Sequence, residues 1–132
     1  MKLSTRSRYG TRLMADLAEH LDSGPIQLGD IAQRQGISVK YLEQLIIPLK
    51  KANWIKSARG PKGGHILAVS PHDITIGEIV SVLESEVTLT HCLDDPETCE
   101  RHDTCKTREV WIKATKAIQD TLHAVKLSEI MK

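Results

Sequence analysis

The stretch that decides the fold reads Gly-Ile-Ser-Val-Lys-Tyr-Leu-Glu-Gln-Leu (36–45), Ile-Ile-Pro-Leu-Lys-Lys-Ala-Asn (46–53) and Trp-Ile-Lys-Ser-Ala-Arg-Gly-Pro-Lys-Gly-Gly-His-Ile-Leu-Ala-Val (54–69). Ser38 is a good N-cap, because its side-chain oxygen can accept from an N–H group that the first helical turn leaves unpaired. The helix that follows is expected to bury one stripe, made of Val39, Leu42, Leu45, Ile46 and Leu49. Pro48 removes a backbone donor, so we expect this helix to kink or restart there.

A shorter helix is expected just upstream, over residues 28–35, with Leu28, Ile31 and Ala32 facing inward and Gly36 ending it. Two helices joined by a short turn that contains glycine form a helix-turn-helix, here over about 28–51. An amphipathic helix over 5–22 precedes the pair and stops at Ser23-Gly24-Pro25.

Two strands follow the helix pair, 54–58 and 65–69, and residues 59–64 form the turn between them. A helix-turn-helix followed by a hairpin wing at about 54–69 is the order of a winged helix. Further helices are expected at 75–84 and at 106–126. The expected fold class is therefore mainly α with a small β-hairpin: a winged helix-turn-helix domain over 1–84, a cysteine-bearing loop over 85–105, and a long helix with a short tail over 106–132.

The second helix of a helix-turn-helix enters the major groove of DNA, so its exposed side chains are candidates for contact with bases or phosphates. Glutamine can pair with adenine, and glutamate can accept from the amino group of cytosine. An ordinary solvated helix face is the alternative interpretation. The candidates on this helix are Ser38, Lys40, Tyr41, Glu43 and Gln44.

The hairpin tip suits the narrow minor groove. Glycines let a backbone approach closely, and the cations Arg59 and Lys62 match the negative potential there. The tip does not fit a phosphate-binding enzyme loop, because no Gly-Lys-Ser/Thr follows it. The candidate tip residues are Arg59, Gly60, Pro61, Lys62, Gly63 and Gly64.

Charge divides the 132-residue chain: residues 1–65 carry eleven Lys and Arg against five Asp and Glu, and residues 66–132 carry seven against twelve. A basic first half suits a polyanion such as DNA. No apolar run approaches the roughly 20 residues that span a bilayer, and no signal peptide is recognisable, so we expect no membrane association and a cytoplasmic location. No nucleophile–base pairing stands out, and an enzyme is not expected.

Three cysteines, Cys92, Cys99 and Cys105, have the spacing Cys-x6-Cys-x5-Cys. An odd number argues against a closed disulfide framework. Three thiolates that converge suit zinc or an iron–sulfur cluster. The spacing alone leaves a cluster, zinc, a reversible disulfide and no metal open.

The run 36–45 together with the tip 59–64 resembles the Rrf2 family of bacterial transcription regulators, and the resemblance extends from residues 3–10 to residues 127–130. It implies a homodimeric winged helix, expected to be a repressor, that binds double-stranded, pseudo-palindromic promoter DNA. By this resemblance Glu43 and its neighbours read the major groove, while Arg59 and the rest of the tip enter the minor groove.

The resemblance also implies that the three cysteines hold an iron–sulfur cluster, as in the sensing branch that includes IscR, NsrR and RirA. The fourth ligand departs from that branch, because Arg108 stands where IscR-like members have histidine and Arg8 where NsrR-like members have an acidic residue. His102 is the first candidate instead and His91 the second, and the cluster type, 2Fe-2S or 4Fe-4S, stays open. The alternative is a CymR-like regulator, controlled by a partner protein or by thiol oxidation.

The closing helix carries an apolar stripe that must be buried somewhere. It could pack on its own winged helix, but pairing with the same helix of a second copy fits better. Small residues, Ala114 and Ala117, would permit close contact between two helices. The stripe consists of Val110, Ala114, Ala117, Ile118, Thr121, Leu122 and Val125.

Overall fold

The computed structural model describes residues 2–84 and 87–131. Positions 1, 85, 86 and 132, which belong to the expected ranges 1–84, 85–105 and 106–132, lie outside the described residues. The regular elements are α1 (Thr5–Glu19), α2 (Leu28–Gln35), α3 (Val39–Lys51), β1 (Ile55–Ala58), β2 (Gly64–Leu67), α4 (Ile76–Leu83), α5 (His91–Asp94) and α6 (Arg108–Ala124), with 3-10 turns at Leu21–Ser23, Pro96–Thr98 and Leu127–Ile130.

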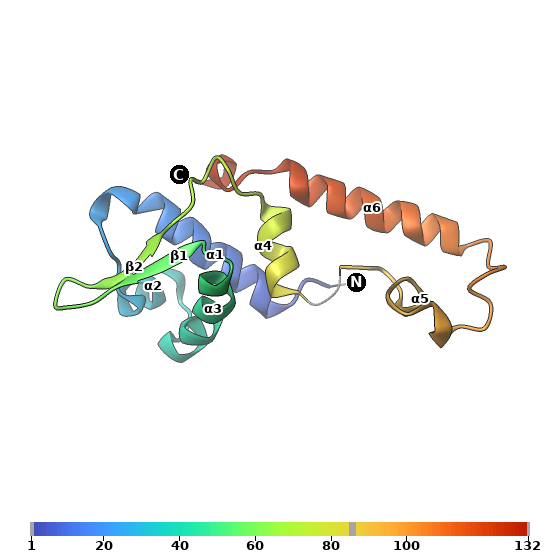
Figure 1. The fold of residues 1–132 in the computed structure, drawn as a ribbon, viewed down its shortest axis with the longest axis horizontal. Coiled ribbons are helices and arrows are strands. Elements are labelled where there is room, and N and C mark those ends of the chain that lie inside the picture. The colour runs from blue at the N-terminus through green and yellow to red at the C-terminus, as the bar shows by residue number, and fades with distance from the viewer. Residues whose placement is uncertain (1, 85–86, 132) are drawn as a thin grey trace.

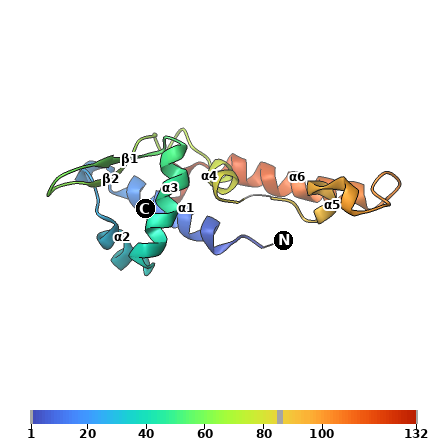
Figure 2. The same cartoon turned by 60° about the horizontal axis from the view of Figure 1, so that its bottom comes forward.

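The molecule is long in one direction (Figure 1). Helices α1, α2 and α3 and the β1–β2 hairpin form one end, and α4 joins them to the other. Helix α6 runs away from this body, and α5 lies beside its first turns (Figure 2). The expected fold class, mainly helical with one antiparallel hairpin, is confirmed, and a helix pair followed by a hairpin is the element order of a winged helix.

Local signals set the helix-turn-helix. Gly36 ends α2 in the left-handed conformation, with φ of 65°, which a residue without a Cβ adopts at low cost. Ser38 then begins α3, and its Oγ accepts from the Tyr41 N–H at 3.1 Å. The bounds expected for α2 are confirmed. The turn between the helices contains the glycine and the capping serine that the sequence predicts there.

Helix α3 buries four of the five residues expected in its stripe, namely Leu42, Leu45, Ile46 and Leu49. The expectation for Val39 is wrong: it is 41% exposed, because it occupies the first helical position, ahead of the turns that pack on the core. Nor does the helix restart at Pro48, since it continues to Lys51. The carbonyl that loses a partner belongs to exposed Gln44, where water can replace the missing donor.

The hairpin pairs Ile55 with Leu67 at its base and Ala58 with Gly64 at its tip. Its outer edge is covered by Ile26, whose N–H and carbonyl both bond to the backbone of His65, at 2.8 and 2.7 Å. The segment before α2 therefore anchors the wing to the helix-turn-helix, a contact that hydrophobic periodicity does not signal.

The chain end returns to the core instead of forming a loose tail. Leu127 is fully buried, and its N–H donates to the Ile74 carbonyl at 2.9 Å. Thr75 caps α4 through a reciprocal pair of bonds with Glu78 and also forms an isolated bridge with Lys126. Helix α6 is thus held to the winged helix at its carboxyl end.

Candidate nucleic-acid interface and cysteine loop

The solvent face of α3 carries a regular stripe. Lys40, Gln44, Ile47 and Lys51 stand at steps of four, three and four residues, so they lie above one another, and all four are exposed. Glu43 flanks the stripe and is also exposed. The buried residues of α3 occupy the opposite side, so this face points away from the protein.

The remaining two candidates on α3 have structural tasks. The hydroxyl of Ser38 is the N-cap described above. Tyr41 is only partly exposed and lies outside the stripe, and its ring meets the Tyr9 ring edge-on, with 5.9 Å between centroids. Tyr41 therefore helps to seat α3 on α1, and a base contact by this residue stays a prediction.

A buried carboxylate braces the helix-turn-helix from behind. Asp16 of α1 is 1% exposed, and it accepts two bonds from the Arg34 guanidinium, at 2.7 and 3.0 Å, and one from Gln35 at 2.9 Å. Burial alone raises the pKa of Asp16, but the hydrogen bonds from Arg34 and Gln35 outweigh it and leave that pKa below its ordinary value. The brace ties the end of α2 to α1 and so orients α3.

The wing tip presents its charges to solvent. Arg59, Gly60, Pro61 and Lys62 are exposed, and Gly60 has φ of 100°, a conformation suited to glycine. Gly63 is buried instead, because its N–H closes the turn onto the Gly60 carbonyl at 2.9 Å and the Ala58 carbonyl leaves no room for a side chain. Gly63 therefore shapes the tip and is not an open contact surface.

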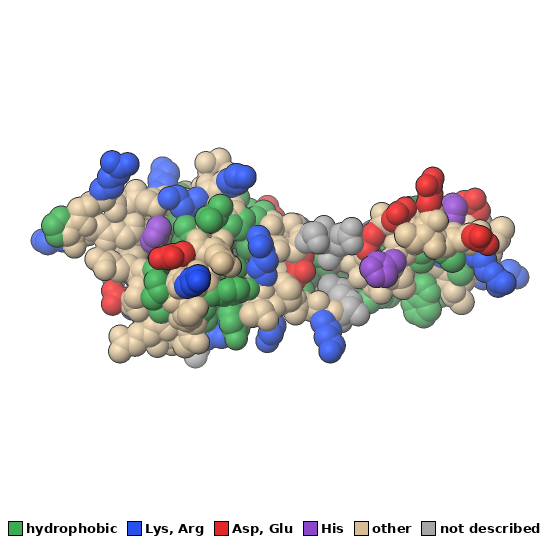
Figure 3. Space-filling view, turned by 90° about the horizontal axis from the view of Figure 1, so that it is seen from below, with side chains coloured by type: hydrophobic (Ala, Val, Ile, Leu, Met, Phe, Trp, Pro, Cys, Tyr) green, Lys and Arg blue, Asp and Glu red, His purple; other side chains and the backbone are tan. Residues whose placement is uncertain are grey.

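The charge asymmetry of the sequence becomes a spatial one. Figure 3 shows Lys and Arg side chains spread over the winged-helix end, and Asp and Glu side chains gathered over the far end of the molecule. Five of the acidic residues there lie between positions 94 and 103. Phosphate groups are therefore attracted more strongly to the winged-helix end than to the acidic residues of the far end.

The three cysteines are all free and partly exposed. The Cys92 thiol contacts the Thr90 hydroxyl at 3.1 Å, and the Cys105 thiol contacts the Thr107 hydroxyl at 3.2 Å. The hydrogen bond with Thr107 is the main reason that the pKa of Cys105 is lowered. Within residues 2–84 and 87–131, no three His, Cys, Asp or Glu side chains come together as ligands for one metal ion. The expected convergence of the thiols is absent from this conformation.

The candidate fourth ligands are also engaged elsewhere or exposed. His102 bonds the Cys99 carbonyl through Nδ1 at 2.9 Å and faces Asp103 through Nε2 at 3.1 Å, while His91 is exposed at the start of α5. Arg108, however, donates to the Cys92 carbonyl through its terminal nitrogen at 3.4 Å, and its buried Nε has no hydrogen-bond partner among the described residues. A negatively charged group bound at Cys92 would give this donor an acceptor. The donor set and this orphaned N–H fit an iron–sulfur cluster, although the thiols are not yet assembled around one.

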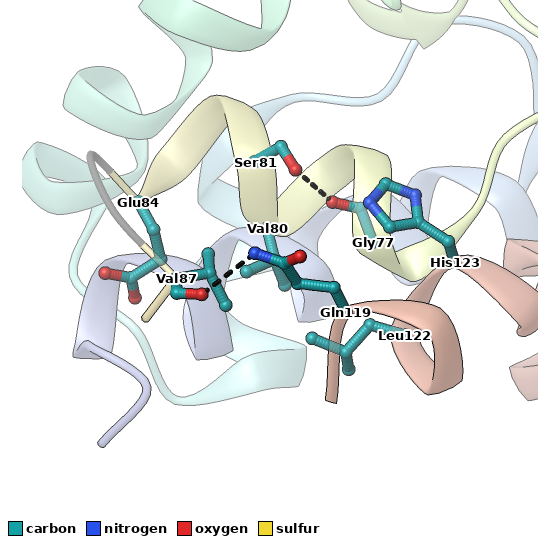
Figure 4. A pocket seen from close by; sticks show the side chains of 8 residues that line it. All are labelled: Gly77, Val80, Ser81, Glu84, Val87, Gln119, Leu122 and His123. Atoms are coloured by element: carbon teal, nitrogen blue, oxygen red, sulfur yellow. Dashed lines mark hydrogen bonds between the residues drawn. The ribbon is translucent and has the colours of Figure 1, made fainter. Parts of the chain in front are cut away.

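A pocket of about 330 Å³ separates α4 from α6 (Figure 4). Its polar groups are already paired within the protein: Ser81 donates to the Gly77 carbonyl at 2.8 Å, and Gln119 donates to the Val87 carbonyl at 3.0 Å. The His123 ring lies so close to Gly77 that a Cβ there would come within 2.5 Å of it. The pocket thus lies where α6 packs against the winged helix, and the described residues that line it form no catalytic constellation.

A family model, "Iron-dependent Transcriptional regulator", matches residues 3–132. The chain belongs to the Rrf2 family. The protein Rrf2 of Nitratidesulfovibrio vulgaris is 46% identical over 132 residues, which is all of this chain and 88% of that protein. The family model and the IscR relatives are described as transcriptional regulators, so the family is one of regulators and not of enzymes, as expected.

Two solved Rrf2-family structures resemble the fold closely. IscR of T. potens matches with a TM-score of 0.81 and 41% identity, over 98% of this chain and 85% of that one. CymR, the global cysteine regulator of B. subtilis, matches with a TM-score of 0.82 and 38% identity, over 98% and 95%. Because the chain is similar to both IscR and CymR, the way in which the DNA affinity of this Rrf2 regulator is controlled has to be inferred from its own residues.

Sequence reasoning missed two features of the site. Ile47 and Lys51 complete the α3 stripe, and the step of seven residues from Lys40 to Ile47 was the available signal. The brace at Asp16 has no such signal, because its partners lie 18 and 19 residues away.

Proposed function

We propose that this chain is a homodimeric, sequence-specific repressor that binds double-stranded promoter DNA in the cytoplasm. The observation that carries the proposal is the pairing of two exposed elements: the polar stripe of α3 and the cationic tip of the wing at Arg59 and Lys62. Helix α3 is the second helix of the pair and takes the major groove, while the tip takes the adjacent minor groove. Within the 1–84 unit, Gln44 and Glu43 supply hydrogen-bonding groups for base edges.

Dimerisation is supported by the uncovered face of α6. Among the described residues, Val110 begins the stripe and is 54% exposed, the flanking Trp111 and Ile112 are 40% and 41% exposed, and the stripe continues through exposed Ala117 to partly exposed Leu122. An exposed apolar stripe of this length is typical of an interface. A second copy related by a twofold axis would cover it and present two α3 helices to successive major grooves. The 106–132 segment is then the dimerisation unit.

The binding assay uses fluorescence anisotropy with the promoter fragment that the unaltered protein enriches most from a pool of genomic fragments, and with scrambled duplex as competitor. Arg59→Ala is expected to weaken binding and to lower the salt dependence by nearly one counterion, whereas Lys113→Ala, an exposed cation on α6, is the matched control. Glu43→Ala is expected to relax sequence preference more than it lowers affinity. Equal affinity of the unaltered protein for promoter and scrambled DNA would refute the proposal.

Control of DNA affinity is assigned to the loop 85–105, whose Cys92, Cys99 and Cys105 would hold an iron–sulfur cluster, with His102 or His91 as the fourth ligand. Such a group supplies reversible electron storage and sensitivity to oxygen. The chain's own contribution is the soft thiolate donor set and Arg108, which donates to the Cys92 carbonyl through its terminal nitrogen at 3.4 Å and whose buried Nε, without a partner among the described residues, would be a donor for a negatively charged group bound there. The loop also bonds to α6, since the Thr115 hydroxyl accepts from the Leu89 N–H at 3.3 Å, so a change in the loop can reach the dimer helix.

A second candidate mode of control is CymR-like, through a partner protein or thiol oxidation. It is supported by three free, partly exposed thiols, which an oxidant can reach, and by the similarity to a cysteine regulator. The two modes differ in what the purified protein contains.

Anaerobic purification followed by iron, acid-labile sulfide and zinc assays distinguishes them. Cluster control predicts iron and sulfide in equal amounts, and their loss in each Cys→Ser variant. His102→Ala and His91→Ala test the fourth ligand, with exposed His72→Ala as the matched control. Protein without iron or sulfide, whose DNA affinity changes on thiol oxidation, would favour the second mode.

A further inference from the structure

Ile47 is the most exposed large hydrophobic side chain among the described residues, at 60%. It stands in the middle of the polar stripe of α3, between Gln44 and Lys51, and the buried residues Leu42 and Leu49 lie on the other side of the helix. An aliphatic side chain in this place gains nothing from the protein's own core. The packing and the charges around Ile47 indicate which kind of partner this side chain contacts.

Helices α1, α2 and α4 and strand β1 make the main contacts with α3, whose buried residues are Leu42, Leu45, Ile46 and Leu49, whereas Ile47 stays exposed among the described residues. Helix α6, which carries the apolar stripe for a second copy, runs along the upper side of the molecule in Figure 1, whereas α3 lies at the lower side of the body. Neither the fold nor the proposed dimer helix covers Ile47.

Charge around Ile47 identifies a nucleic acid as the occupant. Lys40 lies about 10 Å along the helix before Ile47, and Lys51 lies about 6 Å after it. Cations at both ends of an exposed helix face match phosphates on either side of a groove, and the major groove, about 12 Å wide, admits a helix. Only the centre of the face then meets base edges, and Ile47 is in that centre.

The thymine methyl is the one apolar group that standard base pairs present in the major groove. We propose that Ile47 is a specificity residue that contacts the C5 methyl group of a thymine in each half of the DNA site. Ile47 is about 4.5 Å along the helix from Gln44, so this thymine lies within about two base pairs of the base that Gln44 contacts. The proposal rests on the proposed function as a DNA-binding regulator.

The test begins with selection of bound duplexes from a random pool by the unaltered full-length protein. Each thymine of the selected site is then replaced by deoxyuridine, which lacks only the methyl group, and affinity is measured by anisotropy. Loss of one buried methyl contact is expected to weaken binding about four-fold in one half-site and about fifteen-fold in both. Only one thymine in each half-site is expected to show this loss in full.

Variants assign the effect to Ile47. Ile47→Ala is expected to bind the thymine and deoxyuridine sites with nearly equal affinity, and Ile47→Val to retain most of the difference. Val39→Ala is the matched control, since Val39 is an exposed aliphatic residue of the same helix that lies outside the stripe. It is expected to keep the full difference between the two sites.

Three outcomes are decisive. Loss of affinity with deoxyuridine in the unaltered protein, removed by Ile47→Ala and kept by Val39→Ala, supports the proposal. If the selected site binds equally well with deoxyuridine at every thymine, the proposal is overturned. It is also overturned if the Ile47→Ala protein remains as sensitive to deoxyuridine as the unaltered protein. Either result leaves the DNA-binding function intact. Failure to select any sequence refutes the proposed function itself.

Discussion

The brace between α1 and α2 offers the sharpest test of what orients the DNA-reading helix. Replacing Asp16 by alanine removes the acceptor of three hydrogen bonds, two of which come from Arg34. Breaking a fully buried ion pair costs about 3–5 kcal/mol. Asp16 is 1% exposed, but the Arg34 side chain is 37% exposed and can be rehydrated, so we expect a smaller loss of about 2–3 kcal/mol in the free energy of unfolding.

Asp16→Asn keeps the shape and one acceptor oxygen and loses the charge, so about 1–2 kcal/mol is expected. The pH dependence distinguishes the charge from the shape. Because the pKa of Asp16 is lower in the folded protein than in the unfolded chain, its carboxylate stabilises the fold above about pH 4, and this contribution disappears as the pH falls through the folded pKa. The Asp16→Asn protein is expected to lack that part of the acid dependence.

The assay is equilibrium unfolding in urea at one fixed protein concentration, followed by the fluorescence of Trp54, which packs against the core. With a typical slope of about 2 kcal/mol per molar urea, Asp16→Ala is expected to lower the midpoint by about 1–1.5 M. Lys116→Ala removes an exposed ion pair with Asp120 and is the control, with an expected change below about 0.5 kcal/mol. A midpoint for Asp16→Ala within the range of that control would refute the reasoning.

Three further predictions concern α4 and the wing. Burial raises the pKa of Glu84, but hydrogen bonds, foremost from Ser4, lower it by more. The Glu84 carboxylate therefore stabilises the fold, and this contribution is lost as the pH falls below about 4.5. Acid unfolding of the Glu84→Gln protein is expected to show a smaller loss of stability over this pH range. Gly64→Ala puts a Cβ against the Ile26 backbone at φ of 150°, and thermal unfolding is expected to show a loss of about 1–3 kcal/mol; an unchanged Tm would contradict this. Thr75→Ala removes the cap of α4 and is expected to cost about 1 kcal/mol in urea unfolding, while Thr75→Ser retains most of that stability.

Much of the candidate DNA site could be predicted from local sequence signals. Gly36 and Ser38 mark the turn between α2 and α3, and the tip 59–64 marks the wing, because each acts on the backbone within a few residues of itself. The apolar steps of α3 then determine which side faces solvent. The error at Val39 arose because periodicity does not tell where along the helix packing begins.

For the cysteines, local sequence signals do not predict the arrangement that the structure shows. Their spacing suggests a common ligand, whereas in the structure Cys92 contacts the Thr90 hydroxyl and Cys105 contacts the Thr107 hydroxyl, each two residues away in sequence. The orphaned Nε of Arg108 beside Cys92 became visible only in three dimensions.

By itself, the sequence determined the order of the helices and the wing, the polarity of the reading face and the separation of charge along the chain, since all of these follow from neighbouring residues. Only the tertiary structure decided that Leu127 closes the core, that Ile26 anchors the wing and that Asp16 braces α2. Such contacts join residues distant in sequence, and their free energy comes from burial and pairing that exist only once the chain has folded.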